Sequence, residues 1–115
     1  MAAPKYIYHG TNKSFYDFQM HMHPGIYSPR EFWCASSPGY AVMRAVSYAR
    51  KHESEPLVLI IPTEGIESII ENKGGYFFVL QDGLRTNQFR LAEVETDEQG
   101  RAVEANVQRI LALTL

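Results

Sequence analysis

The sequence has a single cysteine, Cys34, among its 115 residues. One thiol can form neither an internal disulfide nor a cluster of thiolate ligands around a metal ion. Cys34 lies in an apolar run without a basic neighbour, a setting typical of a buried, inert thiol rather than a nucleophile. His21 and His23 could ligate a metal ion from one strand face, but no third ligand accompanies them, so we expect no metal site.

The sequence also lacks a strong charge imbalance and a long apolar run. Its formal net charge is −2, which argues against a broad nucleic-acid surface, because such a surface needs a basic excess. The longest apolar stretch, residues 57–61, is far too short to span a bilayer, so no membrane association is expected. Residues 1–5 carry one charge with no apolar run after them, so no signal peptide is predicted. These features favour a cytoplasmic protein; if the protein is exported, we expect a route without a cleaved signal.

Length and composition are those of one small globular domain, residues 1–115. Hydrophobic residues make up 45% of the chain and charged residues 21%, as in an ordinary soluble domain. A chain of this size buries roughly 65% of its unfolded surface on folding, so it needs no disulfide or metal for stability. The sequence contains no repeat, linker or low-complexity tract. We therefore predict a single domain.

The pattern of short strands and one principal helix predicts an α+β fold. Short β-branched or aromatic runs predict strands at residues 6–8, 32–35, 57–61, 76–80 and 88–94. The run at 57–61 is apolar on both faces and is expected to be central. The principal helix is expected at residues 38–52, because a serine cap and Pro38 precede an apolar stripe at helical spacing.

Other segments give less regular predictions. Residues 12–30 are expected to be irregular, since two prolines and Gly25 interrupt them. A short helix is expected after Thr63, ending near Gly74. Turns are expected at residues 82–83 and 97–100. The tail at 102–113 fits a helix, while residues 110–115 alone fit a strand.

A candidate binding segment lies at the end of the first predicted strand. His9 precedes Gly10, and a glycine at this place lets a backbone approach a ligand closely. An amide ligand can pair with the N–H and C=O of Gly10, and Thr11 adds a hydroxyl. On the principal helix, Tyr48 could stack on a flat ring or belong to the core. Arg44, four residues earlier on the same face, could bind phosphates or form a surface pair.

The segments YHGT, at residues 8–11, and FWCASSPGYAVMRAVSYA, at residues 32–49, resemble the poly-ADP-ribose-polymerase-like and diphtheria-toxin-like ADP-ribosyltransferases. Members of that superfamily carry His-Gly on the first strand, a tyrosine on a later strand and Ala/Ser-x-x-Tyr on the next helix. A glutamate follows on a late strand, often between asparagine and an aromatic residue. The resemblance implies a compact split β-sheet core with one principal helix, and NAD as the bound substrate.

Residue roles follow from this resemblance. His9 would bond the nicotinamide ribose, Gly10 the carboxamide through its backbone, and Thr11 would lie near the adenosine. Tyr48 would stack on the nicotinamide, and Arg44 is the candidate for the NAD phosphates.

Two positions depart from the family pattern. Trp33 stands where the family usually has the strand tyrosine, and Gln88, in Asn-Gln-Phe, stands where the strongest transferases have glutamate. Glutamine can hydrogen-bond, but it brings no negative charge to the cation that develops as nicotinamide leaves. Glu93 and Glu95 rank second, because they lie on the opposite strand face from Gln88 by parity.

The function implied is an NAD-dependent mono-ADP-ribosyltransferase, by analogy a small effector or toxin, with Gln88, His9 and Tyr48 as its catalytic residues. The expected target is a protein, and a nucleic acid is not favoured. One alternative is a non-catalytic domain of the same fold that acts through NAD or protein binding, favoured by Gln88. Another is a tRNA 2′-phosphotransferase-like enzyme, with Arg44 and Arg90 as its only candidate phosphate ligands.

Overall fold

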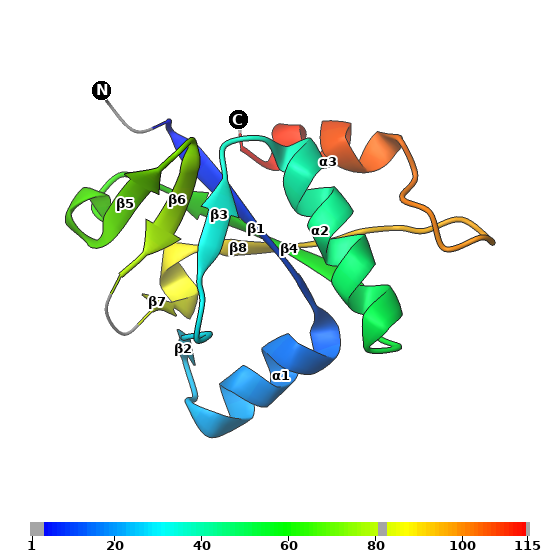
Figure 1. Ribbon diagram of the computed structural model, residues 1–115, viewed down its shortest axis with the longest axis horizontal. Helices are drawn as coiled ribbons and strands as arrows, with labels where there is room; N and C mark the ends of the chain where they lie inside the picture. The colour runs from blue at the N-terminus through cyan, green and yellow to red at the C-terminus, as the bar shows by residue number, and fades with distance from the viewer. Residues whose placement is uncertain (1–3, 81–82, 115) are drawn as a thin grey trace.

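The chain folds around an antiparallel β-sheet flanked by helices (Figure 1). The structure, a computed structural model, describes residues 4–80 and 83–114. Six strands pair in the order β5-β6-β3-β1-β4-β8. They are β1 (Tyr6–Asn12), β3 (Trp33–Ala35), β4 (Pro56–Pro62), β5 (Ile70–Lys73), β6 (Tyr76–Val79) and β8 (Arg90–Glu93). The short strands β2 (Ile26–Tyr27) and β7 (Leu84–Arg85) form a separate two-stranded ribbon.

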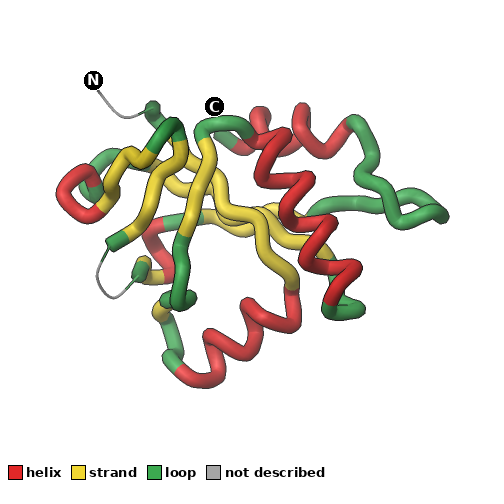
Figure 2. Tube along the Cα trace, viewed as in Figure 1, coloured by secondary structure: helices red, strands yellow, loops and turns green. Residues whose placement is uncertain are grey.

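Residues 4–80 and 83–114 also form three α-helices and two 3₁₀ helices. The α-helices are α1 (Lys13–Met22), α2 (Pro38–Lys51) and α3 (Ala105–Leu113), and the 3₁₀ helices are η1 (Glu67–Ile69) and η2 (Thr86–Gln88). Figure 2 shows α1 following directly from the end of β1, on the opposite side of the molecule from α3. Helix α2 contacts β1, β3, β4 and α3. The strand that carries the candidate binding segment therefore lies against two different helices.

One face of the sheet is covered by α2 and α3. Side chains at even positions of the central strands, among them Tyr8, Val58 and Ile60, pack there against small residues of α2. The buried residues of that helix are Ala41, Val42, Ala45, Val46 and Ala49. Because these side chains are short, the helix backbone comes close to the sheet. An added Cβ at Gly10 would lie 2.2 Å from the carbonyl oxygen of Ala41 and 2.7 Å from the amide nitrogen of Ala45.

The other face of the sheet holds an aromatic core. Residues at odd positions, such as Ile7, Leu59 and Ile61, pack there against Tyr27 and Phe32. Helix α1 contributes its partly buried residues Tyr16 and Met20 to this cluster. The rings of Tyr16 and Tyr27 are stacked with their centroids 5.6 Å apart. The aromatic contacts link α1, β2 and the segment before β3 into one layer.

Strand β1 separates from β3 just before Gly10. Among the described residues, these two strands pair only through Tyr8 and Ala35. On the other side, β1 pairs with β4 along its whole length. The neighbouring bonds Lys13 N–H to Glu55 C=O (2.8 Å) and Thr63 N–H to Lys5 C=O (3.0 Å) show that odd residues direct their backbone groups toward β4. Since antiparallel ladders alternate, the N–H and C=O of Gly10 point away from β4, into the opening beside β3.

Several sequence predictions are confirmed. The fold is α+β, and the strands expected at 32–35, 57–61 and 76–80 are present as β3, β4 and β6. Strand β4 is an interior strand, paired with β1 on one side and β8 on the other. The principal helix begins as expected, with the Ser37 hydroxyl accepting a hydrogen bond from the Tyr40 N–H (3.4 Å). The tail forms helix α3, and the turn at 97–100 closes with Gly100 N–H donating to Asp97 C=O. Residue 82 of the turn predicted at 82–83 lies outside the described residues.

Other predictions are wrong. The first strand does not end at Tyr8, because the pairing with β4 continues through Gly10 to Asn12. Residues 13–22 form α1 instead of an irregular segment, since Asn12 Oδ1 accepts from Phe15 N–H (2.8 Å) and caps the helix. The helix expected after Thr63 is only the short η1, followed by β5. The last sheet strand begins at Arg90 rather than Gln88.

We predict that Gly10→Ala destabilises the protein by about 1–3 kcal/mol, because a new Cβ would overlap backbone atoms of α2. Gly39→Ala is the matched control, since its Cβ would meet nothing nearer than 3.6 Å. In that helical position we expect no loss, or a gain of up to about 1 kcal/mol. Urea unfolding of the three proteins measures both effects. Equal unfolding free energies for Gly10→Ala and wild type would contradict the packing described.

Candidate functional site

Two adjoining hollows open where β1 and β3 separate. The first has a volume of about 560 Å³ and extends toward α1, and the second has about 400 Å³ and extends along α2 toward β6. Both are lined by His9, Gly10, Glu31 and Tyr48. We call the two hollows together the β1–β3 cleft. The structure therefore brings Tyr48 to His9 and Gly10, although Tyr48 lies far from them in the sequence.

His9 is held by hydrogen bonds at both ring nitrogens. Its Nδ1 lies 2.7 Å from the Trp33 carbonyl oxygen, and its Nε2 lies 3.0 Å from the Tyr27 hydroxyl. Because a carbonyl only accepts, Nδ1 carries the proton and donates it, and Nε2 accepts from the Tyr27 hydroxyl. The ring of Phe32 lies against the imidazole, with centroids 4.7 Å apart. The His9 side chain thus ties β1 to β3 and to β2.

Burial keeps His9 neutral. It lowers the pKa of the imidazole to about 4; the Trp33 carbonyl opposes the shift and the charge of Arg44 adds to it. Burial likewise raises the pKa of the Tyr27 phenol, although a hydrogen bond from Thr11 works against that shift. At neutral pH the pair is therefore a neutral imidazole and a neutral phenol. Neither group provides a charge to the cleft.

Gly10 and Thr11 form the floor of the cleft. The backbone N–H and C=O of Gly10 point into the opening, as the strand register requires. Thr11 is buried and lines the hollow on the α1 side. An N–H donor and a C=O acceptor from one residue can pair with a primary amide, which offers the complementary acceptor and donor. The floor of the cleft is suited to such a group.

Tyr48 is half-buried and lines both hollows from α2. Arg44, one helical turn earlier, donates a hydrogen bond to the Tyr48 hydroxyl. The Arg44 guanidinium carbon also lies 4.8 Å from the centre of the Tyr48 ring. A guanidinium over an aromatic face is a favourable cation–π contact. The two side chains form a paired wall, and Arg44 lines only the hollow on the β6 side.

Trp33 is not a core residue. Its ring is 41% exposed, lines the hollow on the β6 side and lies 4.8 Å from the ring of Phe78, measured between centroids. Parity on the short strand β3 explains this, because Cys34 faces the core and Trp33 faces away. The Trp33 carbonyl contributes by accepting from His9.

The structure does not bring Gln88 to His9 and Tyr48. Gln88 ends helix η2, where its side-chain oxygen accepts from Arg85 N–H (2.8 Å), and it lines neither hollow. The sequence prediction treated residues 86–88 as part of the strand, but these residues form a 3₁₀ turn before β8 begins. Strand β8 lies beyond β4, at the sheet edge away from β3. The prediction that Gln88 lies at the cleft is therefore wrong.

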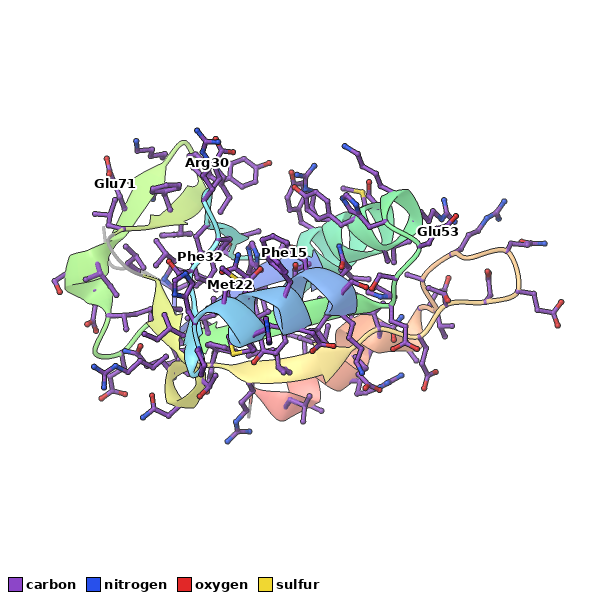
Figure 3. All side chains as sticks on the ribbon, turned by 90° about the horizontal axis from the view of Figure 1, so that it is seen from below. Phe15, Met22, Arg30, Phe32, Glu53 and Glu71 are labelled. Carbon is purple, nitrogen blue, oxygen red and sulfur yellow. The ribbon has the colours of Figure 1, made fainter. Side chains whose placement is uncertain are left out.

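Glu93 and Glu95 do not replace it. Both line a separate hollow beside β8, and Glu95 pairs with Arg109 at 3.3 Å. Within residues 4–80 and 83–114, Glu31 is the one carboxylate that lines either part of the cleft. Figure 3 shows Arg30 and Phe32, the neighbours of Glu31 in sequence, on the same side of α1 as Phe15.

Sequence reasoning missed several residues of the cleft. Tyr27 and Arg30 come from the segment expected to be irregular, and Glu31 directly follows that segment. Tyr40, Tyr76 and Lys73 complete the hollow on the β6 side. The rings of Tyr40 and Tyr76 lie 5.4 Å apart, measured between centroids. The one available signal was that Glu31 directly precedes the strand run at 32–35. Nothing in the sequence indicated that β6 neighbours β3.

Two expectations about reactive groups can be compared with the structure. Cys34 is buried, so the prediction of a buried thiol is confirmed. Burial also raises the pKa of this thiol, as expected for an unreactive cysteine. His21 and His23 lie at the end of α1, not on a strand. In the part of the chain that the structure describes, no helix is both long and apolar enough to cross a bilayer.

No protein-family model and no curated protein matches this chain. Among solved structures, its fold is similar to that of protein CC0527 from Caulobacter crescentus, with a TM-score of 0.62 and 14% sequence identity. The match covers 92% of this chain and 98% of that one. A double mutant of the same protein gives the same values. At this identity the similarity concerns the fold alone.

We predict that His9 makes the stability of the protein depend on pH. Its pKa is lower in the folded state than the ordinary 6.5, so the unfolded state binds the proton more tightly. The contribution of the neutral, buried His9 to the free energy of unfolding should be fully present above about pH 6.5. It should fall by about 3 kcal/mol as the pH drops to about 4.

Urea unfolding at a series of pH values measures this dependence in wild type, in His9→Gln and in a control, His21→Gln, whose histidine is exposed. The difference in slope between wild type and His9→Gln isolates His9 from the carboxylates that titrate in the same range. A slope unchanged in His9→Gln would show that His9 does not titrate as described.

Proposed function

We propose that this chain, which shares its fold with protein CC0527, binds NAD in the β1–β3 cleft and acts as a mono-ADP-ribosyltransferase. The observation that carries the proposal is the opening beside Gly10, whose N–H and C=O point into a cleft that Tyr48 also lines. The family that the sequence resembles uses such a backbone for the nicotinamide carboxamide. The compact split sheet expected for that family belongs to this proposal as well.

The nicotinamide end fits the shared part of the cleft. Its carboxamide accepts from the Gly10 N–H and donates to the Gly10 C=O, as two backbone groups in a shielded place allow. Its ring is flat and positively charged in NAD, so the half-buried Tyr48 ring attracts it both by stacking and by a cation–π contact. Arg44 lies over the Tyr48 ring and is exposed. Its long side chain is free to turn from the ring toward the diphosphate.

The remaining groups support the two ends of the substrate. Arg30 and His52 line the hollow on the α1 side, and Arg44 and Lys73 line the one on the β6 side. Basic side chains at these positions favour the negatively charged diphosphate and steer it toward the cleft. Thr11 lies on the α1 side, which suits the expected contact near the adenosine.

His9 contributes in a different way from the one that the family resemblance implies. Both of its ring nitrogens already have partners inside the protein, so a ribose hydroxyl would have to replace or share the Tyr27 hydroxyl at Nε2. We therefore assign His9 mainly to holding the cleft open between β1 and β3. The Tyr27 hydroxyl, which donates to Nε2, keeps lone pairs that can accept from a sugar hydroxyl.

A non-catalytic NAD-binding domain is the second candidate function. The position of Gln88, away from His9 and Tyr48, favours it, because the residue expected to assist the reaction lies outside the cleft. Release of nicotinamide from NAD separates the two candidates. A transferase with water as acceptor gives ADP-ribose and nicotinamide, whereas a binding domain gives neither above the uncatalysed background.

We predict that NAD binds the purified protein and that Tyr48→Ala weakens binding roughly 2- to 12-fold, the loss of about 0.5–1.5 kcal/mol of stacking. Tyr48→Phe should keep most of the affinity, because the ring face makes the contact. Met43→Ala is the control, since Met43 is exposed on the same helix and lines neither hollow of the cleft.

Isothermal titration calorimetry measures all four affinities, and circular dichroism verifies that each variant is folded. Binding that is equal in Tyr48→Ala and wild type would remove Tyr48 from the site. Absence of NAD binding to the folded wild-type protein would overturn the proposed function.

A further inference from the structure

Glu31 occupies a defined place at the β1–β3 cleft. It directly precedes Phe32, which is buried and whose carbonyl accepts from the Val79 N–H at 2.9 Å. The Phe32 ring lies against the ring of His9. The backbone beside Glu31 is therefore anchored to β6 on one side and to β1 on the other. Glu31 is exposed and lines both hollows, together with Gly10 and Tyr48.

The charge of Glu31 is not used inside the protein. In the described part of the chain no hydrogen bond or ion pair engages its carboxylate, although Arg30 and Arg44 line parts of the same cleft. Other acidic side chains of the described residues lie outside the cleft. A carboxylate without a partner beside two adjoining hollows can respond to a charge that develops there.

We infer that Glu31 is the catalytic carboxylate of this site. It stands beside the ribose carbon C1′ of bound NAD, and it stabilises the positive charge that appears when the bond to nicotinamide breaks. This inference rests on the proposed function, because it takes NAD as the substrate. It places the catalytic negative charge in the segment before β3. The resembled family has this charge on a late strand, as a glutamate at the position matched here by Gln88.

The reaction balances with water as the acceptor. The C1′–N1 bond breaks, and both of its electrons stay with N1, which converts the pyridinium into neutral nicotinamide. The ribose C1′ becomes an oxocarbenium-like cation next to the Glu31 carboxylate. A water oxygen then bonds to C1′ and loses a proton to the solvent. The products are nicotinamide, ADP-ribose and one proton, and a nucleophilic group of a protein target replaces water in the transfer reaction.

Electrostatics explains why the carboxylate acts mainly on the rate. In NAD the positive charge lies on the nicotinamide ring, whereas in the transition state part of it has moved to the ribose. A negative group aimed at C1′ gains attraction as this charge moves, so it lowers the barrier more than it strengthens binding. A solvated glutamate without this function would change neither rate nor affinity when replaced.

The experiment compares Glu31→Gln with wild type and with Glu98→Gln. The control removes the same charge from an exposed residue in the turn at 97–100, away from the cleft. Nicotinamide release is followed by chromatography, NAD affinity by calorimetry and folding by thermal unfolding. We expect Glu31→Gln to release nicotinamide more slowly than wild type by a factor of roughly 100 or more. Its NAD affinity should stay within about threefold of that of wild type. Glu98→Gln should match wild type in both, and Glu31→Asp should keep part of the rate.

Each failure has its own signature. Unchanged nicotinamide release in folded Glu31→Gln overturns the assignment of Glu31 and leaves the proposed function in place. A wild-type protein that binds NAD but releases no nicotinamide also overturns it, and favours the non-catalytic binding domain. A loss of affinity equal to the loss of rate makes Glu31 a binding residue and contradicts its catalytic assignment. Absence of NAD binding in wild type overturns the proposed function itself, and the Glu31 assignment with it.

Discussion

The close approach of α2 to β1 at Gly10 is the constraint on which the rest of the site depends. Only a residue without a Cβ leaves space for the helix backbone, because an added carbon would lie 2.2 Å from the Ala41 oxygen. The small buried side chains of α2 allow the helix backbone to lie close to the sheet at Gly10. Consequently Arg44 and Tyr48, one and two turns further along the helix, stand over the floor of the cleft. The absence of a Cβ thus serves packing and the cleft at once.

His9 performs the complementary task on the other face of the sheet. Its neutral ring connects the Trp33 carbonyl of β3 to the Tyr27 hydroxyl of β2. A continued ladder between β1 and β3 would place Trp33 opposite Gly10 in the register set by Tyr8 and Ala35, but the imidazole takes the Trp33 carbonyl instead. The opening beside Gly10 is therefore maintained by a buried hydrogen-bonded ring. The cost of leaving either partner unpaired in this environment makes the arrangement rigid.

The distribution of charge around the cleft gives it a direction. The central groups, His9 and Tyr27, are neutral because burial disfavours their ionised forms. Basic side chains line both hollows, and Glu31 is the one acidic residue in the described part of the chain that lines them. This arrangement of charges is the one expected if the cleft binds NAD as proposed, with the diphosphate near the basic side chains and the nicotinamide bond near Glu31. In this arrangement His9 shapes the cleft, and other residues contact the substrate.

The sequence by itself determined the local features of this protein: an α+β fold, the serine-capped helix with Tyr48, the strands beginning near Tyr6, Trp33 and Leu57, and an inert Cys34. Periodicity and capping are short-range properties, so a single chain displays them. Sequence reasoning misplaced Gln88, because tertiary pairing determines where a 3₁₀ turn ends and a strand begins. It also missed helix α1 and the position of Glu31. Which strands become neighbours, where β1 leaves β3, and which carboxylate reaches the cleft depend on contacts between residues far apart in the chain. Only the tertiary structure decided these, because strand order and register are determined by the packing of both sheet faces and not by any one segment.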